Sequence, residues 1–156
     1  MEGKQVWVRH FKRSDVSQLL ILMKKLAEFE SYIDHFVVTE ADIIGRGLCK
    51  KPQFYALVAG REGSESLAGM AVLYIIPYTY TLKPSMVLKE LYVKESARGF
   101  QLGSTLFEEA KKFASSNKCG QLIWTVMKGN EKAEQFYVSH KSKPDEKWKN
   151  WFYKLE

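Results

Sequence analysis

The stretch KELYVKESARGFQLGSTLFEEA, Lys89 to Ala110, joins two kinds of periodic pattern through a short turn. An alternating apolar run ends in a charged loop, which passes through Arg98-Gly99 into a helical pattern with Gly103 in its first turn. Glycine lowers helix stability by about 1 kcal/mol relative to alanine, so its presence here needs a reason. Two interpretations are open: an ordinary strand-to-helix turn, or a backbone that a ligand approaches closely.

The start of this helix has the chemistry of a phosphate site. Helix N-termini expose unpaired N–H groups and the positive end of the dipole, and glycines let a phosphate reach the backbone. The Rossmann fingerprint G-x-G-x-x-G is absent, and no Walker lysine followed by Ser or Thr is present. Spacing alone does not choose between a phosphate site and a solvated turn.

Length and composition predict one globular domain over residues 1–156. The chain is 46% hydrophobic and 13% aromatic, which argues against disorder. No apolar run approaches the ~20 residues that span a bilayer, and no signal peptide is visible. Cys49 and Cys119 lack metal-ligand spacing and are interpreted as free, buried thiols, which predicts a cytoplasmic protein. The net charge of +6 favours phosphate-bearing partners without choosing among them.

Periodicity predicts the order β-α-α-β-β-β-α-β-α-β, a mixed α/β sheet with helices on its faces. Three positions indicate helix starts: Ser14, the capping box Thr39-Glu-Ala-Asp42, and Asn130. The expected strands cover residues 5–9, Phe54–Ala59, Leu67–Ile76, Met86–Val93, Gln121–Met127 and, last, the aromatic segment from Trp148 to Lys154.

Four blocks in order carry a family resemblance: LAEFE, TEADI, RGFQLGS and NEKAEQFY. The hexapeptide Arg98–Gly103 resembles the coenzyme A pyrophosphate loop, R/Q-x-x-G-x-G/A, of the GNAT N-acetyltransferases. Together the blocks resemble the diamine (spermidine/spermine) acetyltransferase branch. The resemblance implies the GNAT fold, a mostly antiparallel sheet, acetyl-CoA as cosubstrate, a small-molecule amine as acceptor, and a homodimer. One position departs from the loop pattern, because Gln101 replaces a glycine and its Cβ could narrow the loop.

The resemblance also assigns site residues. It assigns the binding of the pantetheine arm and of the acetyl carbonyl to the backbone of Leu91, Tyr92 and Val93. It gives the diphosphate to the loop, and proton donation to the leaving sulfur to Tyr137. Without it, Tyr137 is simply a half-buried aromatic on a short helix and Asn130 only a cap. The cofactor-binding set is Leu91, Tyr92, Val93, Arg98, Gly99, Phe100, Gln101, Leu102, Gly103, Ser104, Asn130 and Ala133.

The acceptor site departs most from the branch, which has Leu-Glu-Asp where this chain has Leu88-Lys89-Glu90. Alternation puts Lys89 and Glu90 on opposite faces, so Glu90 takes over the catalytic carboxylate's role only if a β-bulge re-aims it, and the family has one in this strand. Otherwise Glu90 is a surface charge. Glu30 matches a cation contact of the branch, or is a solvated helix-end charge. We therefore expect an acceptor amine that is a polyamine, a diamine or a lysine-like amino acid, the last suiting Lys89 better.

Two other functions compete with the enzyme. A GNAT-like module that binds coenzyme A without catalysis is motivated by Lys89, by Gln101 and by the unusual segment after Tyr137. A nucleic-acid-binding protein is motivated by tail lysines interleaved with aromatic residues, although alternation along a final strand explains the same letters. His10, His35 and His140 have no ligand spacing, so we expect no metal.

Overall fold

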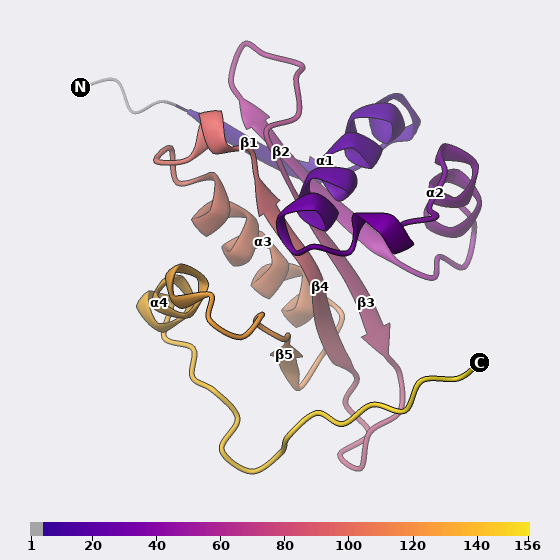
Figure 1. The fold of residues 1–156 in the computed structure, drawn as a ribbon, viewed down its shortest axis with the longest axis vertical. Helices are drawn as coiled ribbons and strands as arrows, with labels where there is room; N and C mark the ends of the chain where they lie inside the picture. The colour runs from indigo at the N-terminus through magenta and orange to yellow at the C-terminus, as the bar shows by residue number, and fades with distance from the viewer. Residues whose placement is uncertain (1–4) are drawn as a thin grey trace. The chain divides into compact units, whose positions relative to one another are not determined.

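The structure, a computed structural model, describes residues 5–156 and contains two compact units, one that runs to Thr125 and one from Val126 to Glu156. The first unit holds a five-stranded sheet in the order β1-β2-β3-β4-β5, with helices on its faces (Figure 1). Its strands are β1 (Val6–His10), β2 (Tyr55–Arg61), β3 (Gly69–Ile76), β4 (Ser85–Val93) and β5 (Gln121–Ile123). Its helices are α1 (Val16–Phe29), α2 (Glu40–Gly47) and α3 (Leu102–Ser116), with short 3₁₀ turns η1 (Arg13–Asp15), η2 (Ile33–His35) and η3 (Glu95–Ala97).

The sheet is mixed and mostly antiparallel, as the sequence predicts. Strands β1 to β4 pair as antiparallel neighbours, and β5 pairs in parallel with β4. The strand expected over Gln121–Met127 is shorter than predicted and ends at Ile123. Its pairing with β4 covers three residues on each side and stops at Val87↔Ile123.

Hydrophobic alternation explains how the helices cover the sheet. Ala56, Val58, Met70 and Val72 face α1 and form one buried cluster with its apolar stripe. Residues of the opposite parity face α3, whose Leu106 lies against Gly69. Figure 1 shows α1 and α2 on one face of the sheet and α3 on the other. Transferring this much apolar surface out of water is the main force that holds the first unit together.

The helix starts follow local capping chemistry, with one correction. The capping box at α2 is confirmed: the Thr39 N–H donates to Asp42 Oδ2 at 2.9 Å, and the Asp42 N–H donates to Thr39 Oγ1 at 3.2 Å. Ser14 was the wrong cap for the first helix. Residues 13–15 form η1, and Asp15 precedes α1 instead. The Asp15 carboxylate accepts the Lys12 N–H at 2.8 Å and two hydrogen bonds from Arg9, which fix the chain where β1 turns into the helix.

The second unit contains α4 (Glu131–Ser139) and an extended tail. The Asn130 cap is confirmed, because Asn130 Oδ1 accepts the Ala133 N–H at 3.1 Å. The predicted final strand over residues 148–154 is wrong: no regular structure forms there, and Trp151 and Phe152 are 92% and 93% exposed. A strand needs a neighbour for its backbone groups, and none pairs with the tail among residues 5–156. Alternation of apolar and polar residues indicates a strand only where such a neighbouring strand exists.

The cysteines are free, but the prediction that they are buried is wrong. Cys49 is exposed in the turn after α2, where its Sγ donates to the Lys51 carbonyl at 3.3 Å, and Cys119 is half-buried. Within the described part of the chain, no helix combines the length and apolarity needed to cross a bilayer.

Candidate functional site

The loop between η3 and α3 is held in an unusual backbone conformation. Gly99 has φ +85° and Gln101, the residue before the helix, has φ +61°. A residue other than glycine in this left-handed region costs about 1 kcal/mol, so Gln101 is mildly strained. Gln101, which replaces the glycine of the family pattern, therefore makes this left-handed backbone conformation less favourable. The turn nevertheless forms as it would with glycine.

The same loop presents a run of backbone donors that nothing else uses. Among residues 5–156, the N–H groups of Gly99, Gln101, Leu102, Gly103 and Ser104 have no acceptor, and the Gln101 side chain does not cap the helix. The first helical bond is made by the Thr105 N–H, which donates to the Gln101 carbonyl at 2.9 Å. A Cβ built on Gly99 meets nothing within 4 Å, so the approach to the backbone is open. Free N–H groups at the positive end of a helix fit a diphosphate.

Strand β4 separates from β5 directly before this loop. Their pairing ends at Val87, so from Leu88 to Val93 the edge of β4 on the β5 side has no strand partner among the described residues. Leu91, Tyr92 and Val93 lie in this part of β4, still paired on the other side with β3. An unpaired strand edge leaves backbone donors and acceptors for an extended ligand.

A β-bulge re-aims the middle of β4. The register between β3 and β4 runs Leu73↔Leu88 and then Val72↔Glu90, so Lys89 is the extra residue. Val72 faces α1, and its partner Glu90 therefore lies on the α1 face. Lys89 and Glu90 both lie close enough to Glu30, at the end of α1, to interact with it electrostatically. Strict alternation is thus broken at the position where the acceptor site was expected.

Burial perturbs the acids that meet here. One carboxylate oxygen of Glu90, Oε2, is inaccessible to solvent and has no hydrogen-bond partner among residues 5–156. Burial raises the pKa of Glu90 to about 7, Lys89 opposes the shift, and Glu30 adds to it. Burial likewise raises the pKa of Glu30, again opposed by Lys89. Burial together with Glu90 and Glu30 raises the pKa of Tyr32 to about 12.

A carboxylate that titrates near neutrality, with one unsatisfied oxygen, can accept a proton or bind a cation. The predicted residues Glu30, Lys89 and Glu90 are thus brought together. Tyr32 joins them although the sequence analysis missed it. Its position two residues after Glu30, at the end of α1, was the one signal that could have found it.

Asn130, Ala133 and Tyr137 belong to the second unit. Asn130 and Ala133 form the cap of α4. Tyr137 is half-buried on that helix, and its ring centroid lies 5.2 Å from that of Phe136. Within the second unit, these contacts agree with the local roles that the sequence predicts for Asn130 and Tyr137.

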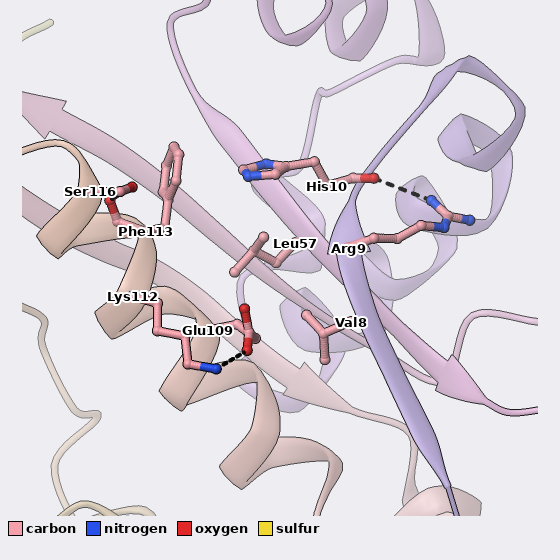
Figure 2. Close-up of a pocket in the computed structure, with 8 residues that line it drawn as sticks. All are labelled: Val8, Arg9, His10, Leu57, Glu109, Lys112, Phe113 and Ser116. Atoms are coloured by element: carbon pink, nitrogen blue, oxygen red, sulfur yellow. Dashed lines mark hydrogen bonds and ion pairs between the residues drawn. The ribbon is translucent and has the colours of Figure 1, made fainter.

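Two hollows lie elsewhere on the first unit. A groove of about 400 Å³ runs between β1 and α3; Figure 2 shows Phe113 and His10 facing each other across it and the ion pair of Lys112 with Glu109. It contains none of the predicted site residues. A second hollow of about 300 Å³ lies beside the start of the loop and is lined by Arg61, Ser64, Ser66, Leu67, Ala68, Lys94, Ser96 and Ala97. The described residues contain no group of three or more metal-ligating side chains.

Comparison with known proteins decides the family. The model of the Acetyltransferase (GNAT) family matches residues 18–140, which include β4, the loop, α3 and all of α4. The chain belongs to the GNAT acetyltransferase family. As a GNAT protein it is an N-acetyltransferase.

Individual relatives agree with the diamine acetyltransferase branch. The GNAT chain is 28% identical over 138 residues to a thialysine N-epsilon-acetyltransferase of Sus scrofa, covering 85% of this chain and 81% of the relative. It is 26% identical over 137 residues to a human spermidine/spermine N(1)-acetyltransferase-like protein 1, covering 85% of this chain but only 20% of that protein.

Solved structures share the fold. An aminoglycoside acetyltransferase from an uncultured soil metagenomic sample, in complex with sisomicin, has a TM-score of 0.80 at 16% identity over 97% of both chains. A probable acetyltransferase has a TM-score of 0.81 at 21% identity, over 96% of this chain and 98% of the other. At these identities the likeness concerns the fold.

Proposed function

We propose that this protein transfers an acetyl group from acetyl-CoA to a primary amine of a small molecule. The observation that carries the proposal is the set of unused N–H groups at Gly99 and at Gln101 to Ser104, which follows a stretch of β4 that has no strand partner on its β5 side among residues 5–156. GNAT enzymes use acetyl-CoA generally, and these two features suit its diphosphate and its pantetheine arm. When bound, the cosubstrate supplies an acetyl group activated as a thioester.

The chain's own residues hold and orient the reactants. The loop amides bind the diphosphate, and the positive charge of Arg98 adds to their attraction. The free edge of β4 at Leu91, Tyr92 and Val93 hydrogen-bonds the extended arm and polarises the acetyl carbonyl. Asn130 and Ala133, at the start of α4, complete the cofactor-binding set by family resemblance. Holding both reactants in one geometry removes much of the entropic barrier of a two-substrate reaction.

Glu90 and Tyr137 carry out two proton transfers of the reaction, the first as acceptor and the second as donor. A primary amine is protonated near neutral pH and must lose a proton to become a nucleophile. Glu90, with its pKa of about 7 and its unpartnered oxygen, accepts that proton directly or through one water. The amine nitrogen then bonds to the acetyl carbon as the C–S bond breaks, and the Tyr137 hydroxyl donates a proton to the leaving sulfur. The nitrogen releases its second proton to water as the amide forms, and the Tyr137 phenolate takes up a proton from water. The role of Tyr137 comes from the family resemblance.

The charges around Glu90 favour a lysine-like acceptor over a polyamine. Glu30 and Glu90 attract the reacting amine, whereas Lys89 brings a positive charge beside both acids. That charge repels a second ammonium group of a polyamine and attracts a carboxylate. The acceptor is therefore an amine that also carries a carboxylate. The relative from Sus scrofa is named for thialysine, a lysine analogue, which agrees with this choice.

An acceptor screen with a matched ligand pair tests this function. Lysine and cadaverine differ only in the α-carboxylate, so their relative kcat/KM isolates its contribution, and spermidine adds a polyamine. Thiol release and mass-spectrometric detection of the acetylated product are measured together. We expect lysine or thialysine to exceed cadaverine, and Lys89→Ala to remove that preference. Acetyl-CoA binding without product from any amine would instead support the non-catalytic module.

Three further proposals concern assembly and location. We propose that residues 1–156 act as one GNAT domain, that the protein is a homodimer, and that it resides in the cytoplasm, where its free cysteines stay reduced. The exposed aromatic tail supports pairing of residues 148–154 with a second copy, because it has no strand partner in its own chain among residues 5–156. Light scattering of the full chain and of a chain ending at Asp145 tests this: only the full chain should be dimeric.

The exposed tail also keeps one alternative function open to test. Lysines interleaved with exposed Trp148, Trp151 and Tyr153 suit single-stranded nucleic acid. The final strand that would have explained these letters is absent from the described chain. A salt-sensitive shift of a labelled oligonucleotide by the full chain, lost on truncation at Asp145, would favour nucleic-acid binding over dimerisation through the tail.

A further inference from the structure

An arginine at the end of strand β2 contacts the loop that precedes α3. The Arg61 guanidinium carbon lies 3.6 Å from the centroid of the Phe100 ring, and Arg61 Nη2 donates to the Ser96 carbonyl at 3.2 Å. Ser96 is in η3 before the loop, and Phe100 is in the middle of the loop. One side chain thus contacts the segment on both sides of Gly99.

Hydrogen bonds fix the backbone of Arg61, and this restricts where its side chain can contact the loop. It is the last residue of β2 and pairs with Val6 of β1. Its carbonyl accepts the Trp7 Nε1–H at 3.0 Å and the Ser64 N–H at 3.1 Å. Two strands and a turn therefore fix the backbone from which the guanidinium reaches across to the loop.

Phe100 is the loop residue through which a contact can best restrict the backbone conformation. It stands between Gly99 and Gln101, the two residues with positive φ. Left-handed conformations persist where the surroundings over-determine them, particularly at a residue with a side chain such as Gln101. A planar guanidinium over the Phe100 ring fixes the orientation of the two flanking peptide units, and with them the directions of the unused N–H groups.

We propose that Arg61 is a positioning residue for cofactor binding: it holds Phe100 so that the amides from Gly99 to Ser104 are arranged before coenzyme A arrives. The inference rests on the proposed function for the identity of the ligand. Arg61 acts through Phe100 and the Ser96 carbonyl, and its charge is not needed at the diphosphate. A lysine cannot replace it, because an ammonium has neither the planar face nor the forked donors.

The test compares Arg61→Ala and Arg61→Lys with Arg13→Ala, which removes the same charge from an exposed position in η1. Calorimetry measures the dissociation constant of coenzyme A, and ¹⁵N relaxation of the free protein measures the backbone order parameters of the amides around Phe100. We expect both Arg61 variants to bind coenzyme A about three- to tenfold more weakly, the loss that one cation–π contact predicts, with lower order parameters in the loop. Arg13→Ala should match the wild type.

A second variant distinguishes loss of the contact between Arg61 and Phe100 from a general loss of folding. Phe100→Leu removes the ring but keeps an apolar side chain, and it should reproduce the Arg61→Ala effect without adding to it in the double variant. The inference is overturned by unchanged order parameters of the loop amides in Arg61→Ala, by full recovery in Arg61→Lys, or by additive effects. If the wild-type protein binds no coenzyme A, the proposed function fails, while the relaxation measurement still tests the contact between Arg61 and Phe100.

Discussion

Replacing Glu90 by glutamine tests the catalytic base and measures the cost of burying it. The folded protein holds this carboxyl at a pKa of about 7, against about 4.3 in the unfolded chain. Between these values the folded state binds the extra proton, so stability falls as pH rises through the window and is constant above it. The difference corresponds to about 4 kcal/mol. The glutamine side chain cannot ionise, so the Glu90→Gln variant should gain up to this amount over the wild type between pH 4 and pH 8.

The same variant should lose activity where the wild type is most active. The ionised Glu90 is the active base, so kcat/KM of the wild type should rise with pH through a midpoint near 7. The variant should lack this rise and be about 10²- to 10⁴-fold slower at pH 8, the usual contribution of a general base. Denaturant unfolding at several pH values measures the first effect, and thiol release over the same range measures the second.

Glu65→Gln serves as the matched control, because Glu65 is exposed in the turn between β2 and β3. It removes the same charge and should leave the pH dependence of both stability and activity as in the wild type. If Glu90→Gln instead shows a stability curve parallel to that of the wild type and an unchanged rate, Glu90 is neither strongly desolvated nor the base.

Three further substitutions test other parts of the structure. Asp15→Asn breaks the partly buried two-point pair with Arg9 and should lower the free energy of unfolding by about 2 kcal/mol at pH 7. Because Arg9 lowers the pKa of Asp15, this loss should disappear as pH falls below about 4, as urea unfolding would reveal; a loss independent of pH would contradict the ion pair. Gln101→Gly removes the left-handed strain and should raise the melting temperature by a few degrees, or about 1 kcal/mol; a lower melting temperature would count against strain at this turn. Tyr137→Phe should reduce kcat about tenfold or more with unchanged calorimetric affinity for acetyl-CoA. An unchanged kcat with chemistry rate-limiting would remove its role as acid.

Features set by a few adjacent residues could be predicted from the sequence. The Thr39–Asp42 box and the Asn130 cap are local hydrogen-bond patterns, so the letters alone locate two helix starts. The loop from Arg98 to Ser104 was identified because its glycines and its place between a strand and a helix lie within one short stretch. Family resemblance added the bulge in β4, which period-two alternation alone would have missed.

Features that depend on distant partners could not be predicted. Ser14 satisfies the residue preference for a cap, but it lies inside η1, and Asp15, which directly precedes α1, makes no side-chain cap there. Its carboxylate instead accepts hydrogen bonds from Arg9 and from the Lys12 N–H. The tail alternates like a strand, yet nothing in its sequence says whether a neighbour is available. Arg61 is thirty-nine residues before Phe100, as their numbers give, and no local pattern connects them. Tyr32 joins the acids only because α1 ends beside the bulge.

The central claim is that the backbone amides from Gly99 to Ser104 bind the diphosphate of coenzyme A. Titration of the ¹⁵N-labelled protein with coenzyme A, followed by amide NMR, tests it most directly, with pantetheine as a control that lacks the diphosphate. The account predicts that the largest saturable shifts fall on Gly99 to Ser104 with coenzyme A and that these amides stay unshifted with pantetheine. Saturable shifts that leave this loop unchanged, or concentrate in the groove between β1 and α3, would contradict it.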